Sequence, residues 1–232
     1  MQYFALLISK ERNLTPDERA SVMAAFESFH AKAASAIRAG DALTPAATAV
    51  RITGGPDAPI ITDGPFAEAA EVACGYYVLD AENLDEALTL ARDIPVATYG
   101  AVEVWPIYGS FNPGKPLDGT NWLALVLEQP ASALPPGTPE WQAVAAGHAE
   151  FAAAAGDHLV DGAALHEPST ATTVRVRDGE LILTDGPYAE GAEVANGFYV
   201  LGAANREEAV KLASMIPATT VELRQLAGVS GL

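Results

Sequence analysis

The chain has 232 residues, of which 50% are hydrophobic and 19% are charged, and its formal net charge is −17 at pH 7. This composition is that of a folded globular protein rather than a disordered one. The acidic charge repels phosphate backbones and anionic lipid headgroups, so we expect no nucleic-acid partner and no membrane partner. The one cysteine, Cys74, has no internal disulfide partner, which favours a reducing, cytoplasmic location.

The chain begins with a predicted strand followed by a predicted helix. Residues 3–8 are apolar without alternation, which indicates a strand buried on both faces, and the run is too short for a signal or membrane segment. Thr15, Pro16 and Glu18 form a helix start with a capping box. We expect Gly40 to end this helix.

The next elements are predicted from alternation, turn residues and caps. They are a hairpin at 48–53 and 60–62, a strand at 75–80, a helix that begins after Asn83 and ends at Pro95, and a strand at 102–107. Residues 109–120 are rich in Gly, Pro, Asn and Asp, which marks a linker.

The chain after the linker repeats the chain before it. Residues 63–95 and 185–217 align without a gap at an offset of 122 positions, with 21 identities in 33 pairs. The predicted domains are therefore residues 1–108, called the first copy, and residues 121–232, called the second copy. The second copy is predicted to hold strands at 122–127, 198–201 and 221–226, helices at 138–155 and after Asn205, and a hairpin at 173–177 and 180–184.

Each copy thus has the split βαβ pattern of a ferredoxin-like α+β domain with an extra hairpin strand. Two helices cover only one face of a sheet, yet several strands are apolar on both faces. We therefore expect the two sheets to pack face to face as an intramolecular pseudo-dimer, with further homodimerisation left open.

The segments Asp-Gly-Pro-Phe-Ala-Glu at 63–68 and Asp-Gly-Pro-Tyr-Ala-Glu at 185–190 resemble the YCII-related family, in the branch named for its DGPF motif. Residues 47–51 and 171–175, which precede the two hairpin turns, carry the same resemblance. It implies a dimeric α-β barrel, an active-site His on the first helix paired with an Asp, and a setting near sigma factors of the stress response. This chain departs from the family at Ala70 and Ala192, where a Lys is usual.

His148 is the first candidate catalytic residue. It lies on the apolar stripe of the helix at 138–155, which predicts partial burial, and His titrates near neutral pH. It corresponds to the family's active-site His, with Asp185 or Glu190 as the carboxylate that orients it. The alternative is a core histidine, with Asp185 serving only turn geometry. The expected first-copy equivalents are His30, Asp63 and Glu68.

Arg175 and Arg51 are candidate substrate-binding residues, because each alternates with buried side chains on its hairpin and needs a carboxylate partner. An internal salt bridge is the default interpretation. His166 is a third candidate, present in the second copy where the first has Thr44. The spacing from His158 to His166 matches no metal-ligand pattern, so we expect no metal, and no cofactor motif is present.

Two functions remain open on the sequence. The first is an enzyme acting on a small organic acid or lactone, with His148 as general base, Asp185 or Glu190 as its partner and Arg175 holding the substrate anion. The second is a non-catalytic ligand-binding or regulatory module.

Overall fold

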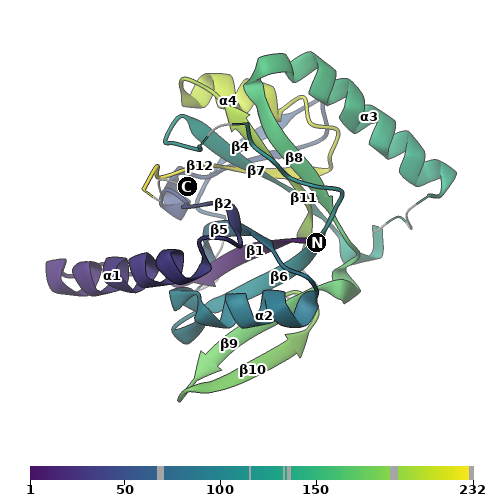
Figure 1. Cartoon of the computed structure of the whole chain (residues 1–232). Coiled ribbons are helices and arrows are strands. Elements are labelled where there is room, and N and C mark those ends of the chain that lie inside the picture. Colours follow the sequence, from purple (N-terminus) through teal and green to yellow (C-terminus); the bar gives the residue numbers. More distant parts are fainter. Residues whose placement is uncertain (67–70, 115, 133, 135–136, 189–192, 230–232) are drawn as a thin grey trace.

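A computed structural model of the chain describes all residues except 67–70, 115, 133, 135–136, 189–192 and 230–232. The first copy contains β1 (Gln2–Ser9), α1 (Pro16–Ala33), β2 (Ile37–Ala42), β3 (Val50–Thr53), β4 (Ile60–Asp63), β5 (Val72–Asp80), α2 (Leu84–Asp93) and β6 (Ala101–Tyr108). The second copy contains β7 (Asn121–Glu128), α3 (Pro139–Ala155), β8 (Leu159–Leu165), β9 (Thr172–Arg177), β10 (Glu180–Asp185), β11 (Val194–Gly202), α4 (Arg206–Ala213) and β12 (Thr220–Gln225). The predicted α+β class is confirmed (Figure 1).

Within each copy, four antiparallel strands follow the ferredoxin-like order. The first sheet runs β2-β5-β1-β6 and the second runs β8-β11-β7-β12. Figure 1 shows α1 and α2 beside the first sheet and α3 and α4 beside the second. Among the described residues, no helix is long and apolar enough to cross a membrane.

The two hairpins are exchanged between the copies. Hairpin β3-β4 of the first copy pairs with β12, where Arg51 lies opposite Glu222. Hairpin β9-β10 of the second copy pairs with β6, where Thr173 lies opposite Glu103. The sequence predicts both hairpins but places each in the sheet of its own copy. The exchange means that each sheet is completed by the other half of the chain.

The two sheets also meet directly. β6 pairs with β8 at Ile107 and Leu165, and a bridge joins Leu43 to Leu226 at the opposite side. The apolar backs of both sheets form one cluster, in which Phe4 of β1 stacks on Phe198 of β11 with ring centroids 4.4 Å apart. Two further clusters lie between each sheet and its own helices. The two sheets therefore contact each other through their apolar faces.

Two strands were not predicted, β2 and β8. Helix α1 ends at Ala33 rather than at Gly40, and Gly40 lies inside β2. Both strands are rich in small residues, so periodicity gives no strand signal. Their glycines have a packing reason, because a Cβ on Gly40 or Gly162 would lie 2.2 Å from the ring of Tyr77 or Tyr199. Asp161, between His158 and His166, thus lies in a paired strand.

Candidate functional site

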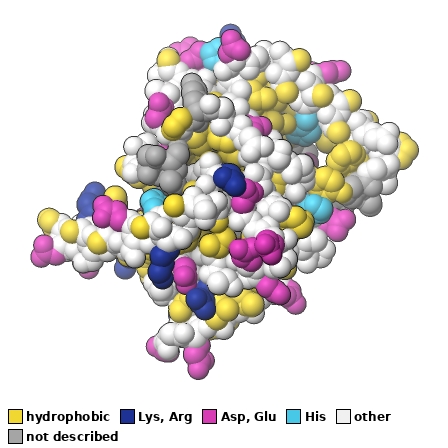
Figure 2. All heavy atoms as spheres, viewed as in Figure 1, with side chains coloured by type: hydrophobic (Ala, Val, Ile, Leu, Met, Phe, Trp, Pro, Cys, Tyr) yellow, Lys and Arg dark blue, Asp and Glu magenta, His cyan; other side chains and the backbone are white. Residues whose placement is uncertain are grey.

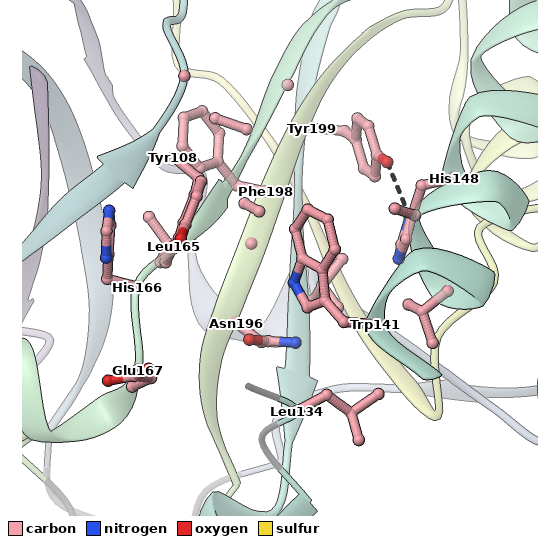
Figure 3. A pocket seen from close by; sticks show the side chains of 18 residues that line it. Tyr108, Leu134, Trp141, His148, Leu165, His166, Glu167, Asn196, Phe198 and Tyr199 are labelled. Atoms are coloured by element: carbon pink, nitrogen blue, oxygen red, sulfur yellow. Dashed lines mark hydrogen bonds between the residues drawn. The ribbon is translucent and has the colours of Figure 1, made fainter. Parts of the chain in front are cut away.

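A cavity of about 400 Å³ opens beside α3 in the second copy, and its lining is mainly apolar and includes several aromatic side chains (Figure 3). Helix α3 contributes Trp141 and His148, and β11 contributes Phe198 and Tyr199. The far wall is formed by the end of β6 and the residues that follow β8. Apolar walls with a few polar groups are typical of a small-molecule site.

His148 is held against the sheet by Tyr199. Its Nδ1 lies 2.8 Å from the Tyr199 hydroxyl oxygen. The helix is fixed there by Phe151, one turn further on, which packs edge-on against the Tyr199 ring at 5.0 Å. Gly162 leaves the space that this ring occupies. The His148 ring therefore has one nitrogen committed to Tyr199 (Figure 3).

Burial sets the protonation state of this pair. Desolvation lowers the pKa of His148 below its ordinary value and raises the pKa of Tyr199 to about 12. At neutral pH both groups are uncharged. Figure 3 shows the second ring nitrogen, Nε2, turned away from Tyr199. Within the described part of the chain, Nε2 has no hydrogen-bond partner, so it is free to meet a ligand.

The opposite wall is a stack of Tyr108 on His166, with ring centroids 4.1 Å apart and planes 19° from parallel. The pairing of β6 with β8 holds it, since the His166 amide donates to the Pro106 carbonyl oxygen at 3.0 Å. Trp141 approaches Tyr108 from α3 at 6.1 Å. The structure thus brings His148 and His166 to one cavity, as two imidazoles among aromatic rings.

Two other second-copy candidates, Asp185 and Arg175, do not line this cavity. Asp185 is an exposed residue of β10, the outer strand of the hairpin whose inner strand, β9, pairs with β6. Arg175 lies over the Tyr188 ring at 4.7 Å. Glu190 is outside the described residues. The hydrogen-bond partner of His148 is therefore Tyr199 and not Asp185, and neither Asp185 nor Arg175 lines the cavity.

His30 makes a similar bond from a different position. Its Nε2 lies 2.7 Å from the Tyr77 hydroxyl oxygen, and Tyr77 matches Tyr199 at the offset of 122. Phe29 packs edge-on against Tyr77 as Phe151 does against Tyr199. At that offset His148 matches Phe26, and Ala152 matches His30. His30 is therefore not the positional equivalent of His148, contrary to expectation.

The first-copy candidate Asp63 lies away from the cavity. Asp63 is exposed and forms an ion pair with Arg206 of α4. Glu68 is outside the described residues. The described residues hold no group of three or more His, Cys, Asp or Glu side chains arranged to bind a metal ion.

A second cavity, of about 210 Å³, lies where the copies meet, and its lining includes charged side chains from both copies. Arg51 of β3 reaches Glu193 and Glu222 of the second copy, at 3.4 Å each. Arg224 is almost fully buried and donates to the carbonyl oxygens of Thr44 and Ala73. The sheet registers place Thr173, not Arg175, at the position of Arg51. The two arginines are thus not equivalent, although both precede a hairpin turn.

Sequence reasoning missed most of the aromatic lining. Tyr199 carried a usable signal, because it is the second aromatic of Phe198-Tyr199 and is kept as Tyr77 in the first copy. Trp141 lies on the same helix stripe as His148, and this pattern predicts that it faces the sheet but not that it lines a cavity. Tyr108 and Phe198 gave no signal, because their place at the cavity depends on the pairing between copies.

Fold and site together define a duplicated α+β protein with a mostly apolar cavity between α3 of the second copy and the end of β6. The YCII-related domain family matches this chain twice, over residues 1–110 and 121–226. The chain therefore belongs to the YCII-related family, and the predicted tandem duplication is confirmed.

Two individual proteins were also found to be similar. The chain is 45% identical over 58 residues to the uncharacterised protein R00369 of Rhizobium meliloti (strain 1021). That match covers 24% of this chain, which spans about half (46%) of the relative's own length. The crystal structure of a protein described as putative chlorite dismutase TA0507 matches with a TM-score of 0.44 and 8% identity, over 98% of this chain and 95% of that one.

Proposed function

We propose that the second copy is a small-molecule enzyme in which His148 moves a proton to or from a bound ligand. The observation that carries this proposal is the free Nε2 of a neutral, oriented imidazole beside a cavity of about 400 Å³. A general base needs a pKa no higher than the working pH and a fixed geometry. Burial lowers the pKa of His148, and the hydrogen bond to Tyr199 fixes the orientation of its ring.

The chemistry follows from the tautomer. When Nδ1–H donates to the Tyr199 oxygen, Nε2 carries a lone pair and can accept a proton from a carbon or hydroxyl group of the ligand. The imidazolium that forms keeps its bond to Tyr199. His166, on the opposite wall, is the natural second group for returning a proton.

The lining favours a mostly apolar ring compound such as a lactone. No arginine or lysine lines the cavity among the described residues, so the substrate anion expected from the sequence has no cationic partner there. Aromatic side chains instead offer flat contact area to a ring. Three aliphatic or aromatic lining residues, Tyr108, Leu134 and Val144, remain 37–40% exposed, which leaves an apolar route inward.

We also propose that the two copies work as one intramolecular pseudo-dimeric α-β barrel of the DGPF branch, in a reducing cytoplasm. The hairpin exchange supports this, because neither sheet is complete without the other copy. Residues 1–108 and 121–232 then mark the duplicated units, joined by 109–120.

The alternative is a ligand-binding or regulatory module without turnover. The observation in its favour is the His30–Tyr77 bond, which shows that this chain also uses a His–Tyr pair at a position not matched to His148. That pair gives a matched control. A His148→Gln variant and a His30→Gln variant each lose one half-buried hydrogen bond, worth about 1 kcal/mol.

The experiment incubates the protein with a panel of lactones, cyclic ketones and phenols in D2O and follows deuterium incorporation by NMR, alongside thermal shifts. We expect exchange with wild type and His30→Gln, and none with His148→Gln. Binding that survives in all three proteins without any exchange would support the regulatory alternative. Equal exchange by His148→Gln and wild type would exclude the enzymatic role.

A further inference from the structure

Strand β10 presents an open, apolar sheet edge. It pairs with β9 on one side, and on the other side no strand of the described chain pairs with it. Figure 1 shows the β9-β10 hairpin extending past α2 at the margin of the molecule. Leu181, Ile182 and Leu183 are 43%, 42% and 47% exposed on this edge. Three successive exposed aliphatics on a free edge are unusual for a monomer.

The edge lacks the features that normally prevent pairing. Natural edge strands carry Lys or Pro, or are interrupted by bulges, and none of these occurs in Glu180–Asp185. The outer strand of the other exchanged hairpin, β4, is only four residues long and directly follows Pro59, so it offers less backbone for pairing. β10 is thus the edge that is better suited to accept another strand.

We propose that two molecules of this protein associate through their β10 strands, antiparallel and about a two-fold axis at Ile182. The sequence Leu181-Ile182-Leu183 is symmetric about Ile182. With Ile182 opposite Ile182 of the second molecule, each Leu181 lies opposite a Leu183, and direct cross-strand neighbours pack within about 5 Å of each other. An isologous contact of this kind closes after two molecules.

The apolar side chains select this register over its neighbours. In the symmetric register Glu180 lies opposite Thr184 of the second molecule. The next registers that keep opposite side chains on the same face place either Ile182 opposite Glu180 or Leu181 opposite Asp185, so an aliphatic side chain would face a carboxylate.

The faces also match. Leu181 and Leu183 lie opposite Val176 and Val174 of β9, and Val174 belongs to the cluster under α2. In the symmetric register the leucines of both molecules lie on the same face of the joined sheet, so this apolar cluster continues across the axis. Ile182 points to the other face, beside Arg175.

The net charge of −17 opposes this association. Because the Debye length shortens from about 30 Å at 0.01 M salt to about 8 Å at 0.15 M, the dimer should strengthen as salt is added. The contact is short, so we expect a dissociation constant in the range of about 1 μM to 1 mM.

The test is sedimentation velocity of the full chain from about 1 μM to 1 mM protein at two salt concentrations. Ile182→Glu places two like charges on the axis, and we expect it to stay monomeric where wild type dimerises. Ile61→Glu on β4, 51% exposed in wild type, is the matched control and should dimerise like wild type. Monomer at every concentration, or dimer loss in the Ile61 variant alone, would overturn the proposal.

A cysteine cross-link tests the register. In a Cys74→Ser background, Ile182→Cys should form a disulfide-linked dimer within minutes of mild oxidation, because the axis brings the two side chains together. Ile61→Cys should not. Equal cross-linking of both variants, or ladders of higher oligomers, would contradict a closed β10 pair and indicate an open β10-to-β4 chain instead.

Discussion

Arg51 of the first copy lies opposite Glu222 of the second, and its Nη2 donates to Glu222 Oε2 at 3.4 Å. The guanidinium also reaches Glu193 at 3.4 Å. Its Nε is buried without a partner among the described residues. The exchanged hairpin is thus attached to its host sheet by an ion pair as well as by backbone bonds.

Replacing Arg51 by Met should destabilise the protein, because Glu193 and Glu222 would be left close together without their shared cation. The Arg51 side chain is 31% exposed, so we expect a loss of about 1–2 kcal/mol, below that for a fully buried pair. Urea denaturation measures it. Arg38→Met breaks an ion pair with Asp80 that is more exposed and should cost under about 1 kcal/mol. Equal losses of unfolding free energy in the two variants would show that the ion pair between the copies stabilises the protein no more than an exposed ion pair does.

Glu103 matches Glu222 in the sheet register, but among the described residues it forms no ion pair with an arginine. It accepts hydrogen bonds from the Trp105 indole and from the Tyr188 amide at 2.7 Å. Burial raises its pKa to about 7. The folded protein therefore keeps a proton on Glu103 between about pH 4.5 and 7 that the unfolded chain has lost, so this residue makes stability fall as pH rises through that range.

We expect Glu103→Gln to remove this fall, which is on the order of 3 kcal/mol across the range. The readout is the slope of unfolding free energy against pH, since the substitution also alters the hydrogen bonds at every pH. Trp105→Phe removes a hydrogen-bond donor that favours the ionised carboxylate, so the pKa of Glu103 should rise further. The loss of stability with pH should then occur at higher pH. A slope unchanged in Glu103→Gln would show that other groups cause the pH dependence.

The duplication and the helix starts could be predicted because they are local. The capping box of Thr15 with Glu18 is present, and Thr138 caps α3. The hairpin exchange could not be predicted, because β3 pairs with β12, about 170 residues away. The residues of a strand do not by themselves specify which other strand it pairs with.

The site could be predicted only in part, for the same reason. The stripe on α3 placed His148 against the sheet, but its bond to Tyr199 joins residues on separate elements. The expectation that His30 is the equivalent of His148 was wrong. It was based on the presence of a histidine in each helix, but Phe29 and Phe151 make equivalent contacts, and aligning the helices by these contacts does not place the two histidines at the same position. The carboxylate expected beside His148 belongs to a hairpin that the exchange carries to the other sheet.

Gly162→Ala should disturb the site through Tyr199. An added Cβ would lie 2.2 Å from the Tyr199 Cδ1 atom, so the ring or the strand must shift. We expect a loss of about 1–3 kcal/mol and a changed environment of the His148 ring in NMR spectra. Gly147→Ala is the control on α3, where the nearest atom is 3.6 Å away and helix propensity favours Ala by about 1 kcal/mol. An unchanged His148 signal in Gly162→Ala would contradict the proposed support.

His148 should titrate below the ordinary histidine value, because burial disfavours its charged form. The unfolded chain then binds a proton between the folded pKa and about 6.5 that the folded chain does not, so stability rises with pH through this window and is lost as pH falls. NMR titration of the ring measures the pKa directly. The pKa of His30 is lowered for the same cause. His148→Gln should therefore remove only part of the stability loss at acid pH, and the double variant with His30→Gln should remove more of it.

In the enzymatic proposal, the rate of proton exchange should decrease at pH values below the His148 pKa, because Nε2 is then already protonated. The His30→Gln substitution should leave the midpoint of this decrease unchanged. A midpoint that follows His30 instead would assign the base to the first copy.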